Sequence, residues 1–132
     1  MEPSLLLDTH AFLWAASDPG ALSASARDAI EDPSSEVYVS AAVAWEVVIK
    51  HSLGKLELPL QPAAYVPARI ASLGFKALPI SLEHALAVSS LPSHHNDPFD
   101  RIMIAQAQVE GLVFVTADTI AQRYSVRVMR AV

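Results

Sequence analysis

The chain has 132 residues, of which 52% are hydrophobic and 17% charged; these values exclude a disordered protein and predict one domain, residues 1–132, with one sizeable core. The net charge of −5 argues against a protein that holds nucleic acid through bulk positive charge. Because the sequence contains no cysteine, disulfide frameworks, zinc–thiolate sites and thiol nucleophiles are excluded, and a catalytic metal would need oxygen or imidazole ligands.

Four short apolar segments are predicted to be buried β-strands, at residues 4–8, 36–40, 76–80 and 111–116. The first is continuously apolar through Leu5–Leu7 and stops at Asp8, as is typical of a strand covered on both faces of a parallel sheet. Pro79 indicates that the third segment lies at a strand end or at an edge of the sheet.

Helical patterns separate these strands, at residues 23–30, 41–52, 63–73 and 99–110. A glycine follows each of the last three, as expected at helix C-termini: Gly54, Gly74 and Gly111. Right-handed crossovers between parallel strands would place helices on both faces of the sheet. The alternation therefore predicts an α/β fold, a three-layer α/β/α sandwich whose central, mainly parallel sheet has about four or five strands.

Two aspartates are predicted to lie at one edge of this sheet. Asp8 ends the first strand, and Asp118 follows two residues after Thr116, where the fourth strand ends. Ligands bind open α/β sheets outside the carboxyl ends of the strands, so both carboxylates should face the binding edge.

Glu46 stands alone in the apolar segment Ala41–Ile49. An unpaired buried carboxylate costs several kcal/mol or takes up a proton, so Glu46 must reach solvent, a partner or a metal. Its helix begins just after the second strand, which places Glu46 roughly one and a half turns from the same edge. Asp100 approaches from the segment His94–Arg101, which leads into the last helix.

Four aspartates also have an interpretation as helix caps: Asp8, Asp97, Asp100 and Asp118. Asp97 before Pro98 is typical of an N-cap, and Asp100 could close a capping box with it. Glu46 has no such interpretation.

Taken together, Asp8, Glu46, Asp100 and Asp118 indicate a metal site. Crowded carboxylates repel one another, and without compensation some of them would take up protons. Mg²⁺ or Mn²⁺ prefers carboxylate and water oxygens and would neutralise the cluster. The chemistry that suits such a site is phosphodiester hydrolysis, in which metal ions activate a water and stabilise charge on the attacking and leaving oxygens.

Six segments carry a resemblance to a known family: residues 5–10, 40–50, 53–56, 95–101, 104–107 and 115–118. They are similar to PIN-domain ribonucleases, specifically to toxins of the VapC type from bacterial type II toxin–antitoxin pairs. The most specific piece is His-Asn-Asp-Pro-Phe-Asp-Arg at residues 95–101.

This resemblance implies a PIN-like fold and an endoribonuclease that uses Mg²⁺ (or Mn²⁺), one or two ions per site, to hydrolyse RNA with a metal-activated water. The catalytic and metal-binding acids of the family fall on Asp8, Glu46, Asp100 and Asp118. Three neighbours are expected to contact and orient these acids without binding the metal themselves: Thr9, Asp97 and Thr116.

Four side chains near the acids are candidate RNA contacts: Lys50, Lys55, His95 and Arg101. The cationic side chains lie close in sequence to the acids and could bind backbone phosphates, or they could be ordinary solvated charges. His94 and His95 could also be metal ligands or proton donors, although imidazole suits zinc better than Mg²⁺. His10 could pack beside the site or act in it.

The resemblance also implies protein partners: a second copy of the chain in a homodimer, and a cognate VapB-type antitoxin whose C-terminal segment blocks the site, with a higher toxin–antitoxin assembly built from both. Two other functions stay open. A catalytically silent PIN-fold binding module would keep the fold with an incomplete set of acids. A haloacid-dehalogenase-like phosphatase would need a second aspartate two residues after Asp8, where His10 stands.

We expect a cytoplasmic protein without a membrane partner. Glu2 and Asp8 flank a very short apolar stretch that lacks the basic start of a secretory signal. The longest apolar segment, residues 37–49, contains Ser40 and Glu46 and is shorter than the roughly 18 residues that a membrane span needs. The absence of cysteine is compatible with a reducing compartment.

Overall fold

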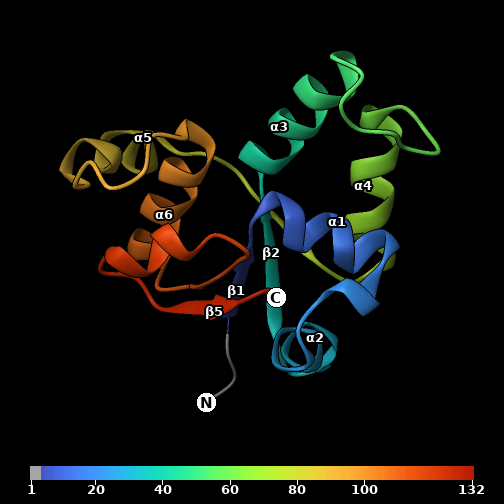
Figure 1. Ribbon diagram of the computed structural model, residues 1–132, viewed down its shortest axis with the longest axis horizontal. Helices are drawn as coiled ribbons and strands as arrows, with labels where there is room; N and C mark the ends of the chain where they lie inside the picture. Colours follow the sequence, from blue (N-terminus) through green and yellow to red (C-terminus); the bar gives the residue numbers. More distant parts are fainter. Residues whose placement is uncertain (1–3) are drawn as a thin grey trace.

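A five-stranded parallel sheet forms the centre of the computed structural model, which describes residues 4–132 (Figure 1). The strands lie in the order β3-β2-β1-β4-β5 and span Ser4–Leu7 (β1), Glu36–Ser40 (β2), Lys76–Leu78 (β3), Val113–Thr116 (β4) and Val128–Arg130 (β5). All four neighbouring pairs are parallel, which confirms the α/β prediction.

Strand β1 is central and fully buried. Leu5, Leu6 and Leu7 are each 0% exposed, and they pair with residues 37–39 of β2 and 113–115 of β4. Because helices cover both faces of a parallel sheet, its inner strands have no polar face, and this explains the unbroken leucine run. Asp8 follows directly, so its position is fixed by both flanking strands.

Six α-helices are present in the described part of the chain: Thr9–Ser17 (α1), Ala24–Glu31 (α2), Ala41–Ser52 (α3), Pro62–Ser72 (α4), Leu82–Ala87 (α5) and Pro98–Glu110 (α6). Three 3₁₀ helices join them: Pro19–Ala21 (η1), Val88–Ser90 (η2) and Thr119–Arg123 (η3). Helices α1, α3 and α4 lie on one side of the strands and α5 and α6 on the other (Figure 1), which is the predicted three-layer arrangement. Among residues 4–132, no helix has the length and apolar character needed to cross a lipid bilayer.

Pro79 directly follows β3, which is an edge strand, as the sequence indicates. Helices α1 and α5 and strand β5 have no counterpart among the predicted elements. For α1 the sequence indicated only a possible cap at Asp8, and α5 and β5, with six and three residues, are too short to show a clear hydrophobic period.

The polypeptide turns into a helical segment after three of the strands, on the side where the acids lie. Asp8 caps α1, Ser40 caps α3 and Asp118 caps η3, each through a side-chain oxygen that accepts a backbone N–H. The N-terminus of α6, capped by Asp97, belongs to the same region, since both Asp97 and Asp100 line the cavity described below. Helix N-termini carry partial positive charge, which favours acidic groups at this edge of the sheet.

Candidate active site

The four predicted acids line one cavity of about 310 Å³ at the carboxyl edge of the sheet. The remaining lining residues come from the segments after β1 and β4, from the last turn of α3 and from the segment before α6: Thr9, His10, Lys50, His95, Asp97 and Ala117. Residues separated by up to 110 positions, Asp8 and Asp118, therefore meet at the edge where the sequence places them.

Asp8 is the most constrained acid of the cavity. It is 4% exposed, and its Oδ1 accepts the Ala11 N–H at 2.7 Å, so it does cap α1. Its Oδ2 accepts the Thr116 hydroxyl at 2.7 Å and the Ala117 N–H at 3.1 Å. Burial raises the pKa of Asp8, and these hydrogen bonds partly oppose the rise. The carboxylate is thus held by three donors, one of which is the N–H that it caps.

Thr116, one of the residues expected to orient the acids, contacts two of them. Its hydroxyl donates to Asp8 and accepts the Asp118 N–H at 3.0 Å. Asp118 in turn caps η3, because its Oδ1 accepts the Ile120 N–H at 2.9 Å. Thr116 is fully buried, so its hydroxyl has no access to solvent.

Glu46 is 7% exposed and does not stand unpaired in α3. Its Oε1 accepts the Thr9 hydroxyl at 2.6 Å, and its Oε2 lies 2.7 Å from Lys50 Nζ, one helical turn away. Thr9 therefore supports an acid, as expected. Lys50, a predicted RNA contact, is paired with Glu46 in this structure.

Asp100 differs from the other three acids because its hydrogen-bonding capacity is mostly unused. No capping box forms at α6, since the Asp97 N–H donates to His95 Nδ1 at 3.1 Å and the Asp97 side chain caps Phe99 N–H. Among residues 4–132, Asp100 has one polar contact, between its Oδ2 and His95 Nε2 at 2.9 Å. Burial, followed by the nearby charges of Asp97 and Asp8, raises the pKa of Asp100 to about 7. Asp100 is the acid that most needs a cation.

His95 lies at the centre of a second polar group. Its Nε2 is 2.6 Å from Asp118 Oδ2 as well as 2.9 Å from Asp100 Oδ2. Ligand atoms of these three residues lie within 4.8 Å of one another, a spacing that a metal ion could use.

The other predicted RNA contacts lie elsewhere. Arg101 donates through Nη1 to the carbonyls of Pro92 and His95 and through Nη2 to that of Val88, so it holds the segment before α6 in place. Lys55 is exposed beyond the end of α3 and does not line the cavity. His10 lines the cavity, with its ring 5.5 Å from that of Trp14.

Tyr124 is a residue of this region that the sequence did not single out. It is 5% exposed, and its hydroxyl accepts the His95 N–H at 2.8 Å and donates to the Pro92 carbonyl at 2.8 Å. A tyrosine 29 residues from His95 carries no local pattern that would indicate this contact.

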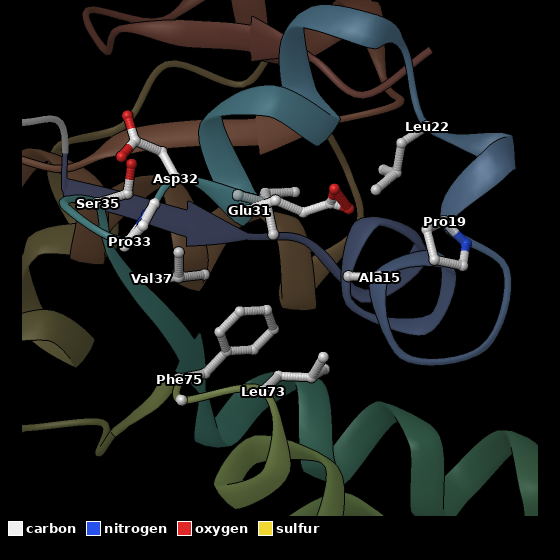
Figure 2. A pocket seen from close by; sticks show the side chains of 12 residues that line it. Ala15, Pro19, Leu22, Glu31, Asp32, Pro33, Ser35, Val37, Leu73 and Phe75 are labelled. Atoms are coloured by element: carbon white, nitrogen blue, oxygen red, sulfur yellow. The ribbon is translucent and has the colours of Figure 1, made fainter.

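A second cavity, of about 420 Å³, lies near the amino end of β2, and its described lining includes none of the predicted site residues. Figure 2 shows the carboxylates of Glu31 and Asp32 beside apolar side chains that include Val37 and Phe75. Glu31 is already paired with Arg27 at 3.1 Å. The predicted acids therefore converge in the first cavity and not in the second.

The donor set of the first cavity fits a hard divalent cation. Carboxylate oxygens dominate it, and no thiolate is available, which favours Mg²⁺ or Mn²⁺ over soft metals. Burial first, and then the neighbouring carboxylates, raise the pKa of Asp100, so a bound cation would favour its charged form.

Comparison with known proteins agrees with this geometry. The PIN domain family matches residues 5–126. A segment of 59 residues is 41% identical to Ribonuclease VapC16 of Mycobacterium tuberculosis and covers 45% of this chain and 40% of that protein. The match therefore spans less than half the length of this curated relative.

Two solved structures share the fold over nearly their whole length. VapBC2 from Rickettsia felis, bound to a DNA fragment from its promoter, has a TM-score of 0.73 at 12% identity and covers 98% of this chain and 99% of that one. DNA-bound VapBC from Salmonella typhimurium has a TM-score of 0.64 at 16% identity, with 96% and 97% covered. These two likenesses show the fold, and the family match over residues 5–126 shows that the chain belongs to the PIN domain family.

Proposed function

We propose that this protein is a divalent-metal-dependent endoribonuclease, with a single nuclease domain, that acts as the toxin of a toxin–antitoxin pair. The observation that carries the proposal is the convergence of Asp8, Glu46, Asp100 and Asp118 on one cavity. The match to a protein named as a VapC ribonuclease supports RNA as the substrate.

In this proposal the four acids hold one or two Mg²⁺ or Mn²⁺ ions. A bound ion supplies the positive charge that activates a water and stabilises the phosphate oxygens. Asp8 and Asp118 enter the site already oriented by Thr116 and by the N–H groups that they cap. Asp100, with an oxygen that no described residue contacts, is available for direct binding.

Glu46 takes a different place in this arrangement. Both of its oxygens have partners, Thr9 and Lys50, at 2.6 and 2.7 Å. Lys50 is half-exposed, and its side chain is long and flexible. Its ammonium group can therefore move from Glu46 to a phosphate oxygen when RNA binds. Lys55, which is exposed beyond the C-terminal end of α3, is the other proposed phosphate contact.

The proposal includes a VapB-type antitoxin and a homodimer. The similar solved structures are titled as VapBC assemblies, which supports a protein partner of that kind. The chain also exposes large apolar side chains that a protein partner could cover, on α3, at its C-cap and on α5: Trp45, Val48, Leu53, Leu82 and Leu86. The cytoplasmic location remains part of the proposal.

The two other functions have less support. A silent binding module has no need for a complete set of acids, whereas all four are present in one cavity. A dehalogenase-like phosphatase would require an acid at His10, and membership of the PIN domain family favours a different chemistry.

The test is to express the chain and to sequence the RNA ends that appear, with an Asp100→Asn variant as the inactive control. We expect new ends in the wild type and none in the variant. Purified protein should cleave the same RNA with Mg²⁺ or Mn²⁺ and stop when EDTA is added. Equal cleavage by wild type and variant, or cleavage in EDTA, would contradict the proposal.

A further inference from the structure

His95 lies between two of the proposed metal-binding acids, and its role there depends on which ring nitrogen carries the proton. Nε2 lies 2.6 Å from Asp118 Oδ2 and 2.9 Å from Asp100 Oδ2. The contact with Asp118 has the geometry of a hydrogen bond from a ring N–H to a carboxylate, whereas Asp100 Oδ2 lies beside Nε2 at ion-pair distance. The same three residues are close enough to bind an ion together, in which case Nε2 would have to offer a lone pair.

The partner of Nδ1 decides between these roles. Nδ1 accepts a hydrogen bond of 3.1 Å from the Asp97 backbone N–H. A ring nitrogen that accepts a hydrogen bond carries no proton, so the proton of the imidazole is on Nε2. Binding of a metal through Nε2 would move that proton to Nδ1, where it would face the Asp97 N–H, and two donors would then oppose each other.

The position of His95 is fixed by its backbone as well as by its ring. The N–H of His95 donates to the Tyr124 hydroxyl at 2.8 Å, and its carbonyl accepts Arg101 Nη1 at 3.3 Å. The Asp97 N–H that faces Nδ1 belongs to the N-cap residue of α6, whose side chain is fixed by the Phe99 N–H. The ring is therefore held with Nε2–H directed at the acids.

We propose that His95 is a positioning residue and not a metal ligand: its Nε2–H donates a hydrogen bond to Asp118 and lies beside Asp100 Oδ2, so that it holds Asp118 next to Asp100 while the cation is bound by carboxylate oxygens. This inference rests on the proposed nuclease function. One N–H placed between two acids reduces their repulsion and orients Asp118, whose other oxygen is fixed by the Ile120 N–H. Asp100 keeps one oxygen free of described protein partners for the ion.

The direct test is the tautomer of His95 in the wild-type protein. Two-bond ¹H–¹⁵N correlation spectra of histidine-labelled protein distinguish the Nε2–H form from the Nδ1–H form for each of the five histidines. Spectra recorded in EDTA and at saturating Mg²⁺ should both show His95 as the Nε2–H form. A change to the Nδ1–H form when Mg²⁺ binds would overturn the proposal. The His95→Gln variant assigns the signals by their loss.

A second test compares variants by Mn²⁺ binding, measured by titration calorimetry. Residues that orient metal ligands typically contribute about 10- to 100-fold to metal affinity. We expect His95→Ala to weaken binding by about tenfold or more on this basis, and His95→Gln, whose amide N–H can replace Nε2–H, to stay within about threefold of wild type. The matched control is His94→Gln, because His94 is the exposed neighbour of His95 and lies outside the cavity.

The outcomes separate this proposal from the function on which it rests. A wild type that binds Mg²⁺, cleaves RNA and shows Nδ1–H at His95 would overturn only the role of His95. Equal Mn²⁺ affinity of His95→Ala and wild type would do the same. A wild type that neither binds Mg²⁺ nor cleaves RNA would overturn the proposed nuclease function together with the positioning role.

Discussion

The hydroxyl of Thr116 donates a hydrogen bond of 2.7 Å to Asp8 Oδ2, joining residues that are 108 positions apart. The same hydroxyl accepts the Asp118 N–H, so one buried oxygen orients acids at the ends of two neighbouring strands. Removal of this hydroxyl should therefore affect both acids without removing either.

We expect Thr116→Val to lower the free energy of unfolding by about 1–3 kcal/mol, the usual cost of leaving buried polar groups without a partner. It should also weaken Mn²⁺ binding about tenfold or more, because Asp8 loses an orienting donor. Chemical denaturation and calorimetry measure the two effects. Thr116→Ser keeps the hydroxyl and is the matched control; a Val variant with wild-type stability and affinity would show that this hydrogen bond does not support the site.

Asp100→Asn should abolish RNA cleavage while the fold is retained. The Asp100 side chain accepts no backbone hydrogen bond from residues 4–132, unlike that of Asp8, so the amide removes charge at the site without disturbing a cap. Loss of a metal-binding carboxylate should reduce the cleavage rate by about a thousandfold or more, in line with the several kcal/mol that a metal contributes to such reactions. Cleavage rate and circular dichroism are the measurements.

The control for this variant is Asp28→Asn, which makes the same chemical change on an exposed residue of α2. It should cleave RNA as the wild type does. If Asp100→Asn retained full activity, Asp100 would have to be removed from the proposed site.

In EDTA, stability should fall as pH rises, because the pKa of Asp100 in the folded protein, about 7, is above the ordinary value of 3.8. The folded state therefore binds this proton more tightly than the unfolded state. The stabilising contribution is complete below about pH 4 and is lost as the pH approaches about 7. The slope cannot exceed about 1.4 kcal/mol per pH unit for one proton.

Denaturation curves across this pH range measure the effect, and Asp100→Asn supplies the comparison because it cannot ionise. We expect a flatter pH dependence in the variant. Saturating Mg²⁺ should raise the stability of the wild type at pH 7, where the acids are most in need of a cation, and should do so much less at pH 5. A wild type and variant with equal slopes would contradict the assignment of this effect to Asp100.

Tyr124→Phe should loosen the segment that carries His95. The hydroxyl accepts the His95 N–H, so its removal leaves this part-buried N–H without a partner, at a cost of about 1–3 kcal/mol, while the Pro92 carbonyl keeps its hydrogen bond from Arg101 Nη1. Hydrogen exchange at the His95 amide should become faster. Tyr38→Phe is the control, because the Tyr38 hydroxyl contacts only the exposed Glu36 at 3.2 Å; protection of the His95 amide should not change there.

The sequence was sufficient to predict the layers of the fold and the four acids of the cavity. Leu5–Leu7 has the unbroken apolar character of an inner parallel strand, and the aspartates stand next to strand ends and helix starts, where local rules apply. Helix α3 was predicted with its observed bounds, Ala41–Ser52, because Ser40 and Gly54 mark its ends. Such features depend on neighbours within a few residues.

The partners of the acids could not be predicted in the same way. Glu46 was expected to reach solvent, a partner or a metal, but its bond with Thr9 joins residues 37 positions apart in different elements. Contacts of this kind depend on how α1 and α3 pack against one edge, and no pattern along the chain encodes them. Lys50 was predicted to contact phosphate, whereas its spacing from Glu46 also allows the ion pair that the structure shows.

The central place of β1 has a consequence for synthesis of the protein on the ribosome. Asp8 is translated more than a hundred residues before β4, which pairs with β1 and leads to Asp118. A nascent chain that has not reached residue 118 lacks one of the four acids and the Thr116–Asp118 connection. The site that we propose is thus incomplete until β4 and residue 118 have been made and have docked against β1.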